Sequence, residues 1–550
     1  RLTGVGRWNR SCRTYFGVLA AVFGLFWIGA ARLINGGAVW TPGEWAVALL
    51  ALALPASEWA VTTVHGAIKR CFRPMPLLRY DFSEGVPPEA TTMVVIPVIW
   101  SSADDVRETA ERLELHHLAT RDANVHYAML GDFADAEAET EPKDAAIVEA
   151  ARQAVEELNR KYAAPGGSTF HLFLRKRTWN PKENVWMGWE RKRGKLVEFV
   201  ELLRGKTDTG FVWTIGDASV WPRVRYVITL DADTELPMGA ARRMIGAMHL
   251  PFNRPRLNPS QTRVVEGYGV LQPRVSVRYE SVTRTRLVRF WTGDPGVDAY
   301  AFAVSDPYQD GFAEGMFAGK GIFDVDAFAR VLCDRIPENR VLSHDLLEGG
   351  FLRAGLLSDV ELVDEHPATF YAYQRRLHRW VRGDWQLVYW LAPRTADRYG
   401  RRRRVDLGAL TRWQIVDNLR RSLVAPSLYA LVLFGTAGLP GTTAAWWAAA
   451  VATALLPGWR MLAAFGSRHF HLRRLWTAFG QGIIQAAVLP FQTALMADAV
   501  GRTLYRMTVS RRRLLEWVCS AEVERRSKNG KPPVVMMRTA GYVLAALPAA

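Results

Sequence analysis

Three kinds of hydrophobic pattern follow one another along the chain. Residues 15–34 and 45–64 form two apolar runs, each close to the ~20 residues that a helix needs to cross a bilayer. From about residue 90, short apolar runs of strand length alternate with amphipathic segments of helix length. Long apolar runs return after residue 423. The pattern predicts an α/β domain placed between two membrane regions.

The two N-terminal runs are predicted to form a membrane hairpin within residues 1–80. A signal peptide is the alternative for 15–34, but its apolar core would be shorter and a small-residue cleavage site should follow. The second run is weakened by Pro55 and Glu58. Basic residues flank the pair on both outer sides, which places both ends, and whatever follows, in the cytoplasm. These residues are Arg1, Arg7, Arg10, Arg13, Lys69, Arg70, Arg73 and Arg79.

The central region, residues 81–392, reads as strands alternating with helices. The expected strands are 93–99, 125–130, 169–174, 226–230 and 264–271, and the expected helices are 104–119, 143–162, 183–203 and 240–248. Such alternation is typical of a mostly parallel sheet with right-handed crossovers and helices on its faces.

Two carboxylates follow the expected strand 226–230. Strand alternation would put the side chains of Asp231 and Asp233 on the same side, and Pro237 stops the strand. Ligands of open α/β sheets bind at the carboxyl ends of strands, and carboxylate oxygens suit Mg²⁺ or Mn²⁺. A solvated acidic turn is the simpler alternative for an isolated motif of this kind.

A second acidic strand end strengthens the functional interpretation. Asp132 follows the strand 125–130 and is expected at the same sheet edge as Asp231. Lys192 and Lys195 lie between them in the sequence and could face phosphates. Each feature alone is also typical of a solvated surface, but together they predict a nucleotide diphosphate site.

A long segment rich in Gly, Asp and aromatic residues, 293–326, precedes two further motifs. Its length and its aromatic side chains favour a functional loop over a disordered one. In Ser343-His-Asp345-Leu-Leu-Glu348, Ser343 is expected to cap a helix. Asp345 either interacts favourably with the helix dipole or serves as a catalytic base.

The segment Gln374-Arg-Arg-Leu-His-Arg-Trp380 reads as a helix. Arg376, Arg379 and Trp380 share one part of its surface, because positions three or four apart meet. Two cations beside an indole suit a pyrophosphate leaving group next to a stacked sugar. A basic helix at a membrane surface is the alternative.

Residues 393–550 are expected to form a C-terminal membrane region. Arginines precede a pair of spans at 423–438 and 444–459. The run 476–500 is predicted to be re-entrant or interfacial, broken near Pro490, because basic residues lie on both of its sides. An amphipathic surface helix at 501–518 and a further span beginning near residue 540 complete the expected region.

Charge and composition exclude some alternatives. The formal charge is +16, from 70 basic and 54 acidic residues, which raises the possibility of a nucleic-acid binder. The densest arginines lie beside apolar runs, which favours the cytoplasmic face of a membrane and argues against nucleic acid as a partner. The four cysteines show no metal-site spacing and are expected to be reduced thiols. The chain begins without Met and ends within an apolar run, so we expect a piece of a longer protein.

The order of these motifs resembles the processive glycosyltransferases of the GT-A fold, the cellulose and hyaluronan synthase group. A wider resemblance is to the glycosyltransferase region (family 84) of bacterial cyclic β-1,2-glucan synthases, and it covers roughly residues 80–520. The segments that carry it are 211–248, 265–277, 293–296, 314–328, 343–349, 378–386 and 489–517.

The resemblance implies UDP-glucose as donor, a divalent cation, and a growing glucan as acceptor. By the same carry-over, Asp231 and Asp233 would hold the cation on the diphosphate. Asp132 would contact the uridine, with Lys192 or Lys195 nearby. The implied location is a bacterial inner membrane, with the catalytic domain in the cytoplasm.

The remaining motifs also receive roles from the resemblance. Asp345 would be the general base, and His344 and Glu348 would lie on the substrate-binding surface beside it. Arg379 and Trp380, with Arg376, would steady the departing UDP and the acceptor end of the glucan. The implied reaction is a direct displacement that inverts the anomeric carbon. Large carbohydrate-active regions of such synthases have no counterpart in this chain and are expected elsewhere in a parent protein.

Two alternatives to a β-1,2-glucan synthase stay open at this point. One is a synthase of a linear glucan or another polysaccharide, because the shape of the acceptor site sets the linkage. The other is a membrane scaffold with a decayed transferase domain. The intact set of charged motifs argues against decay.

Overall fold

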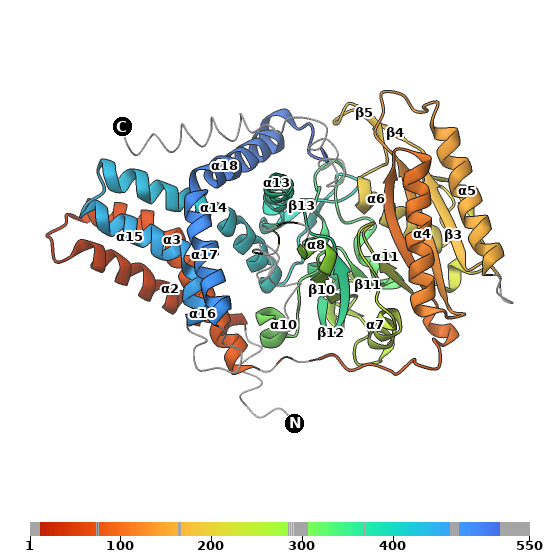
Figure 1. Cartoon of the computed structure of the whole chain (residues 1–550), viewed down its shortest axis with the longest axis horizontal. Helices are drawn as coiled ribbons and strands as arrows, with labels where there is room; N and C mark the ends of the chain where they lie inside the picture. Colours follow the sequence, from red (N-terminus) through yellow and green to blue (C-terminus); the bar gives the residue numbers. More distant parts are fainter. Residues whose placement is uncertain are drawn as a thin grey trace.

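The protein divides into two lobes, a helical lobe and an α/β lobe (Figure 1). The computed structural model describes residues 12–72, 74, 76–162, 167–283, 285, 288, 290, 306–367, 369–462 and 472–517. The helical lobe contains α2 (Cys12–Asn35), α3 (Pro42–Cys71), α14 (Ala409–Ala437), α15 (Thr443–Ala454), α16 (Leu456–Leu462), α17 (Leu472–Ala487) and α18 (Leu489–Tyr505).

An eight-stranded sheet forms the centre of the α/β lobe, in the order β12-β10-β11-β7-β1-β2-β3-β6. Strands β11 and β6 run against the other six. The predicted fold class, a mostly parallel sheet flanked by helices, is confirmed. The strands are β1 (Thr92–Trp100), β2 (Val125–Phe133), β3 (Phe170–Arg175), β6 (Phe211–Ile215), β7 (Tyr226–Thr229), β10 (Val270–Val277), β11 (Gly321–Asp324) and β12 (Ala354–Asp364).

Alternating side chains of the strands pack into two separate hydrophobic cores, one on each face of the sheet. On β1, Val94 and Ile96 face one core, whereas Met93 and Val95 face the other, as the two-residue period of a strand requires. The first core is covered by α4 (Ala103–Thr120), α5 (Asp144–Lys161) and α7 (Ala240–His249). The second is covered by α6 (Arg191–Leu203), α11 (Val325–Leu332) and α12 (Asp345–Leu352). The sheet is therefore buried on both faces.

The chain reverses its direction across the sheet at β1. Strands β2 and β3 follow on one side of it, whereas β7 pairs with its other side. All four run parallel, so their carboxyl ends share one edge. This reversal is the place where open α/β sheets bind ligands.

Two predicted elements of this lobe differ from the structure. The expected helix 183–203 begins with a hairpin of β4 (Thr178–Asn180) and β5 (Val185–Met187), and only α6 is helical. The Asn180 side chain accepts hydrogen bonds from the backbone of the next turn, and Asn184 has a positive φ of 58°. The expected strand 264–271 is split into β9 (Val264–Glu266) and β10 by Gly267, which has φ +64° and lies against the backbone of Arg254.

Short elements complete the lobe and its edges. They are η1 (Pro88–Ala90), η2 (Trp221–Arg223), β8 (Arg256–Leu257), α8 (Tyr279–Thr283), α10 (Pro307–Phe312), α13 (Phe370–Gln386), η4 (Leu387–Leu391), β13 (Arg394–Ala396) and β14 (Arg402–Arg404). Of these, α13 packs against α14 and α18 and joins the two lobes.

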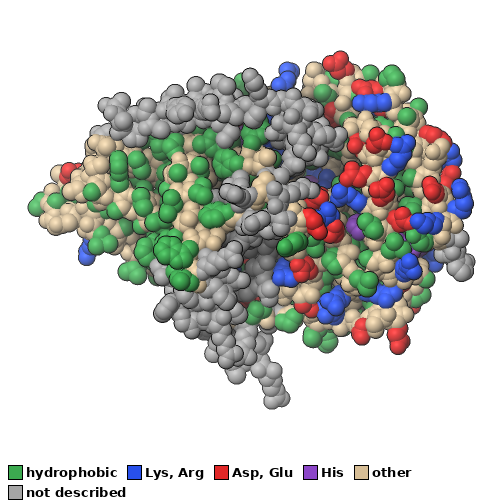
Figure 2. Space-filling view, viewed as in Figure 1, with side chains coloured by type: hydrophobic (Ala, Val, Ile, Leu, Met, Phe, Trp, Pro, Cys, Tyr) green, Lys and Arg blue, Asp and Glu red, His purple; other side chains and the backbone are tan. Residues whose placement is uncertain are grey.

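Two helices in the described part of the chain, α2 and α3, are long and apolar enough to cross a membrane. A third span is possible if α17 and α18 count together, since this pair is bent by 66° next to Pro490. The predicted segment 423–438 is the second half of α14, and 444–459 is divided between α15 and α16. The visible surface of the helical lobe is largely hydrophobic, whereas Lys, Arg, Asp and Glu gather on the α/β lobe (Figure 2).

The C-terminal end of the described chain differs from the expected helix 501–518. Helix α18 ends at Tyr505, a π-helical turn (Arg506–Ser510) follows, and residues 511–517 are not helical. Both Arg511 and Arg513 have positive φ, and the backbone N–H of Arg513 donates to Lys182 of the β4–β5 hairpin. The expected span after residue 540 lies outside the described residues, as do 293–305.

An ion-pair cluster explains the charge within the second apolar run. Arg420 of α14 lies 2.7 Å from Glu58 of α3 and 2.7 Å from Asp417 on its own helix. The Arg420 and Asp417 side chains are only 8% and 2% exposed. Such a buried pair is costly to break, because the remaining charge keeps its desolvation cost.

We therefore expect Arg420→Met to lower the free energy of unfolding by about 3–5 kcal/mol. Thermal unfolding of the detergent-solubilised chain measures the change. Arg152→Met is the matched control, because Arg152 also bridges two carboxylates but lies on the exposed face of α5. Equal midpoints for the two variants would contradict the prediction.

Candidate functional site

The acidic motif after β7 lies in a turn rather than in the strand. The backbone N–H of Thr234 donates to the carbonyl of Asp231 at 3.0 Å, which closes the turn. Strand alternation therefore does not set the directions of Asp231 and Asp233, contrary to the reasoning from the sequence. Both nevertheless lie at the carboxyl edge of β7, beside the reversal in strand order.

Two lysines from distant segments bind Asp231. Lys192 of α6 lies 2.5 Å from Oδ1 and also donates to the carbonyl of Gly319 at 2.9 Å. Lys320, directly before β11, lies 3.2 Å from Oδ2 and pairs with Asp364 at the end of β12. The Asp231 side chain keeps 37% exposure, so it stays open to a ligand.

The two carboxyl groups of this motif have opposite pKa shifts. Burial alone would raise the pKa of Asp231, but attraction to Lys192 and Lys320 outweighs it and lowers that pKa. Burial and the neighbouring carboxylates of Asp364 and Asp231 raise the pKa of Asp233, against the attraction of Lys320. The lowered pKa favours the anionic form of Asp231, whereas the raised pKa lets Asp233 hold a proton more readily.

Asp345 lies beside this group, at the start of α12. Gly319 has a φ of +81°, and a Cβ atom on it would lie 2.7 Å from Asp345 Oδ1, so the Asp345 side chain would have to shift. Burial raises the pKa of Asp345, and the charges of Glu348 and Asp231 add to the rise, against His344 and Lys192. A carboxyl group with a raised pKa is suited to general-base work.

The start of α12 corrects one prediction. The residue before the helix is His344, not Ser343, and it gives no side-chain cap within the described structure. The Ser343 side chain instead packs against Gly383 of α13, where an added Cβ would lie 2.6 Å away. This contact lets α12 and α13 approach closely.

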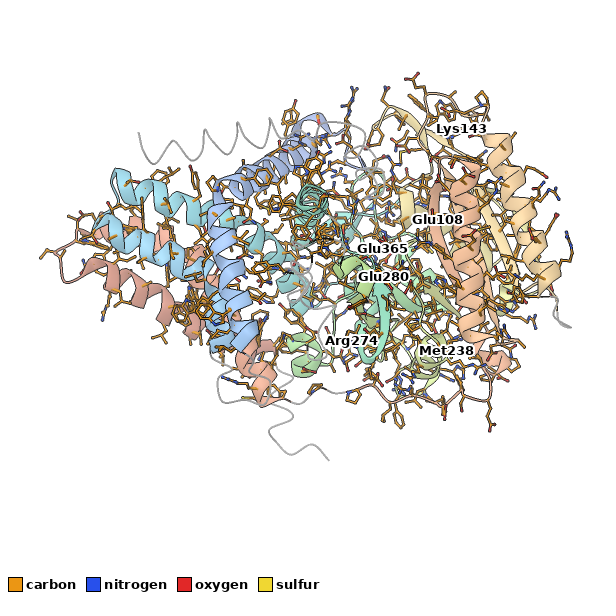
Figure 3. All side chains as sticks on the ribbon, in the orientation of Figure 1. Glu108, Lys143, Met238, Arg274, Glu280 and Glu365 are labelled. Carbon is orange, nitrogen blue, oxygen red and sulfur yellow. The ribbon has the colours of Figure 1, made fainter. Side chains whose placement is uncertain are left out.

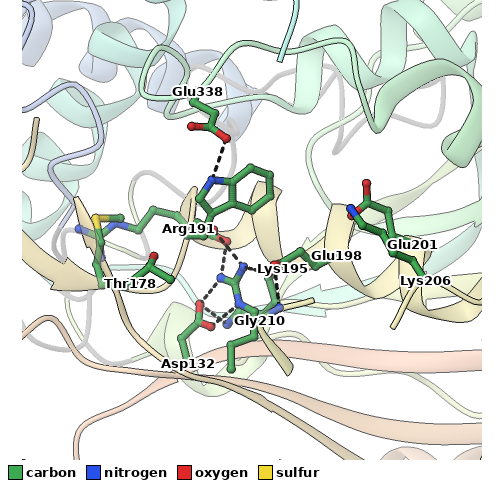
Figure 4. Close-up of polar contacts among 12 residues, drawn as sticks. Asp132, Thr178, Arg191, Lys195, Glu198, Glu201, Lys206, Gly210 and Glu338 are labelled. Atoms are coloured by element: carbon green, nitrogen blue, oxygen red, sulfur yellow. Dashed lines mark hydrogen bonds and ion pairs between the residues drawn. The ribbon is translucent and has the colours of Figure 1, made fainter. Parts of the chain in front are cut away.

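Asp132 belongs to a separate, buried ion cluster (Figure 4). Arg175 of β3 donates hydrogen bonds to both carboxylate oxygens of Asp132 at 2.7 and 2.8 Å, and Lys195 Nζ lies 3.0 Å from Oδ2. Arg175 also binds Glu198 at 2.7 Å. Burial raises the pKa of Asp132, but both cations lower it more, and burial lowers the pKa of Lys195 to about 8.

The two predicted lysines therefore do different things. Lys192 reaches Asp231, whereas Lys195 is buried against Asp132, three residues further along the same helix. The structure brings Lys192, Asp231 and Asp345 together. Lys195 and Asp132 belong to the separate, buried ion cluster.

Arg376, one of the two predicted cations on α13, borders the same site. Arg376 lies over the ring of Trp380 at 4.6 Å, and Arg379 lies over the ring of Trp517 at 5.5 Å. The charge of Arg376 acts on Asp233, which places this part of α13 near the acidic turn. Trp380 packs against the core between α13 and α18.

Residues that the sequence reasoning missed complete the site. Gly319 and Lys320 come from the long aromatic segment, where the run Gly319-Lys-Gly321 was the available signal. Asp364 ends β12, as the other acidic residues end their strands. Figure 3 shows Glu365, the residue after Asp364, near the middle of the molecule, between α4 and the helical lobe.

A second missed contact comes from the segment 511–517. Leu515 is buried, and its N–H donates to the Glu183 carboxylate at 2.9 Å. Gln386 of α13 donates to the carbonyl of Leu514 at 2.8 Å. The segment thereby connects the end of α18 to α13 and to the β4–β5 hairpin that precedes α6.

The donor set of the site suits a hard cation. Asp231 and Asp233 offer carboxylate oxygens on one turn, and the former keeps an exposed side. A divalent ion there would compete with Lys192 and Lys320, which neutralise Asp231 in the structure. A further group that could hold a metal is His344, Asp345 and Glu348.

Replacing Lys320 should destabilise the fold in a pH-dependent way. Lys320→Gln removes a nearly buried ammonium from Asp231 and Asp364, a loss worth about 3–5 kcal/mol. Because Lys320 lowers the pKa of Asp231, its stabilisation is present above the ordinary carboxyl pKa and is lost as pH falls. The deficit in melting temperature should thus stay constant from pH 7 to about pH 5 and should shrink only as the pH falls below about 4. Lys206→Gln, which removes an exposed pair with Glu201, should show neither effect, and a pH-independent deficit would refute the assignment.

Comparison with known proteins agrees with the motifs. No family model matches the chain. The chain is 39% identical over 492 residues to a protein of Rhizobium meliloti (strain 1021) named cyclic beta-(1,2)-glucan synthase NdvB. The match covers 87% of this chain and 17% of that protein, so the chain spans about one sixth of its relative's length. The resemblance inferred from the motifs is confirmed: over most of its length, this chain is homologous to one region of a cyclic β-1,2-glucan synthase.

Proposed function

We propose that the α/β lobe is an inverting, processive glycosyltransferase of the GT-A type, within residues 81–392, that adds glucose from UDP-glucose to a growing β-1,2-glucan. One observation carries the proposal. Asp231 and Asp345, from strand and helix ends more than a hundred residues apart in sequence, lie around Lys192 at the carboxyl edge of the sheet. The proposed product follows from the name of the relative, because a cyclic β-1,2-glucan contains 1,2 linkages.

In the proposed reaction, an oxygen of Asp345 takes the proton from the acceptor hydroxyl as that hydroxyl attacks the anomeric carbon of glucose. The bond to the UDP oxygen breaks on the opposite face, so α-linked glucose becomes β-linked. The raised pKa of Asp345 brings its basicity closer to the pH at which it works. The buried His344 lies next to this carboxylate, with its Nδ1 3.7 Å from Asp345 Oδ1 and 2.8 Å from Glu348 Oε1.

Cationic groups would stabilise the departing diphosphate. Lys192 and Lys320 lie on either side of Asp231, and Arg376 lies near Asp233. Asp231 and Asp233 would hold a Mg²⁺ or Mn²⁺ ion, which supplies further charge stabilisation to the leaving group. Electrostatic stabilisation of this kind is usually the largest contribution to such catalysis.

The remaining residues act as walls of the site. Both oxygens of Asp132 already bind Arg175 and Lys195. The role of this cluster is therefore to hold α6 in position beside the uridine, and Asp132 does not bind the donor directly. Arg379 and Trp380, on α13, would hold the acceptor end of the glucan.

The surroundings fit a membrane-bound enzyme. The described part of the chain offers two candidate membrane spans beside the α/β lobe, or three if the bent pair of α17 and α18 forms one span. We place the α/β lobe on the cytoplasmic side of a bacterial inner membrane, where sugar nucleotides are made. Because the chain matches one sixth of its relative, further carbohydrate-active domains of a parent protein are proposed as partners.

The test is release of UDP by the detergent-solubilised chain with UDP-glucose, Mg²⁺ or Mn²⁺, and a β-1,2-glucan acceptor. Asp345→Asn should lower kcat by about 10²–10⁴-fold, because it removes the base. Asp231→Asn should lower the rate and weaken the dependence on the cation. Asp208→Asn, an exposed carboxyl of the same lobe, is the matched control and should keep full activity.

Linkage analysis of the product completes this test. A 1,2-linked glucan supports the proposal, whereas a 1,3- or 1,4-linked product retains the transferase and overturns the acceptor assignment. No release of UDP from any sugar nucleotide, despite measurable binding of UDP, would favour a scaffold.

A further inference from the structure

Three metal-binding side chains converge at the start of α12. His344 directly precedes the helix, Asp345 is its first residue, and Glu348 lies in its first turn. His344 Nδ1 lies 2.8 Å from Glu348 Oε1 and 3.7 Å from Asp345 Oδ1. One nitrogen or oxygen atom from each of the three residues lies within 4.8 Å of the other two.

The nitrogen of His344 lacks a well-aligned partner. The residue is only 4% exposed, and its Nδ1 makes no aligned hydrogen bond with any residue that the structure describes. The short approach to Glu348 therefore brings a ring nitrogen and a carboxylate oxygen together without a donor directed between them. An ion between the three ligand atoms would give this nitrogen an aligned partner and would contact both neighbouring carboxylates.

We propose that His344, Asp345 and Glu348 form a binding site for a divalent transition-metal ion such as Mn²⁺ or Zn²⁺. A mixed nitrogen and oxygen donor set suits these ions, whereas Mg²⁺ prefers oxygen alone. Three protein ligands leave further positions for water, as in accessible rather than purely structural sites. The Asp345 side chain is 30% exposed and provides the entry, while the other two are buried.

This site differs in chemistry from the acidic turn. Asp231 and Asp233 offer oxygen atoms only, whereas the α12 site includes an imidazole nitrogen. The nearest lysine, Lys192, is paired with Asp231 at 2.5 Å and so does not occupy the α12 site. A bound ion can therefore be assigned to one site or the other by the atoms that surround it.

Occupation of the α12 site has a consequence that rests on the proposed function. A metal ion on Asp345 would withdraw negative charge from the carboxylate and lower its basicity towards the proton of the acceptor hydroxyl. The site is thus inhibitory for transfer, and an ion at the acidic turn is not.

The decisive experiment measures Mn²⁺ on the whole, metal-free chain in detergent, without nucleotide. Pulsed electron paramagnetic resonance detects the coupling of bound Mn²⁺ to a nearby ¹⁴N nucleus. The wild-type chain should show imidazole coupling, and His344→Asn should lose it. Glu348→Gln should retain the coupling but bind Mn²⁺ at least about tenfold more weakly, since even outer-sphere partners of a metal contribute that much.

Two controls keep the test specific. His378→Asn removes a histidine that pairs with Asp498 at 2.8 Å on the other side of α13, and it should keep the Mn²⁺ coupling. The melting temperatures of all variants show whether α12 still folds, and Glu348→Gln gives a second reading if His344→Asn does not fold.

Other outcomes would overturn the proposal. Bound Mn²⁺ without ¹⁴N coupling assigns the ion to the acidic turn, ¹⁴N coupling that persists in His344→Asn assigns it to another histidine, and no bound Mn²⁺ removes the site altogether. Since no turnover is measured, an inactive transferase would leave the result intact. Conversely, failure of the metal site would leave the proposed function standing.

Discussion

The charge balance around Asp231 is the constraint on which the site depends. Two ammonium groups, Lys192 and Lys320, lie against this carboxylate, and Lys320 also neutralises Asp364. Without them, the carboxylates that end β7 and β12 would repel one another in a partly dry environment. The same contacts join α6, β7, β11 and β12 at one edge of the sheet. Stability and the arrangement of the site therefore share one set of interactions.

Features set by local periodicity could be predicted from the sequence. The strand and helix pattern between residues 92 and 161 matches the structure closely, because each element buries its own apolar face. Parallel pairing then brings the ends of β2 and β7 to the same edge, as expected for Asp132 and Asp231. Lys320 and Asp364 escaped prediction, because β11 inserts antiparallel between β7 and β10, a pairing that no local pattern encodes.

Turn chemistry and long-range contacts account for the other differences. The helix expected over 183–203 had the right period, but the hydrogen bonds of Asn180 and the positive φ of Asn184 favour a hairpin at its start. The helix expected over 501–518 stops early, because 511–517 makes its hydrogen bonds with Glu183 and Gln386, far away in the sequence. Asp132 was placed at the correct edge, yet the bidentate contact with Arg175 that buries it depends on the pairing of β2 with β3.

The link between the lobes bears on how a polymer could leave the site. Helix α13 carries Arg376 towards Asp233 on one side and packs through Leu377 and Val381 against Met496 and Ala499 of α18 on the other. The segment 511–517 adds hydrogen bonds from the end of α18 to the same helix. A displacement of α18 by a lipid or a polymer would therefore move α13, since well-packed helices shift together rather than deform. In the proposed enzyme, the helix that holds the acceptor end is thus mechanically part of the membrane region, which couples the position of each new acceptor hydroxyl to the helices beside it.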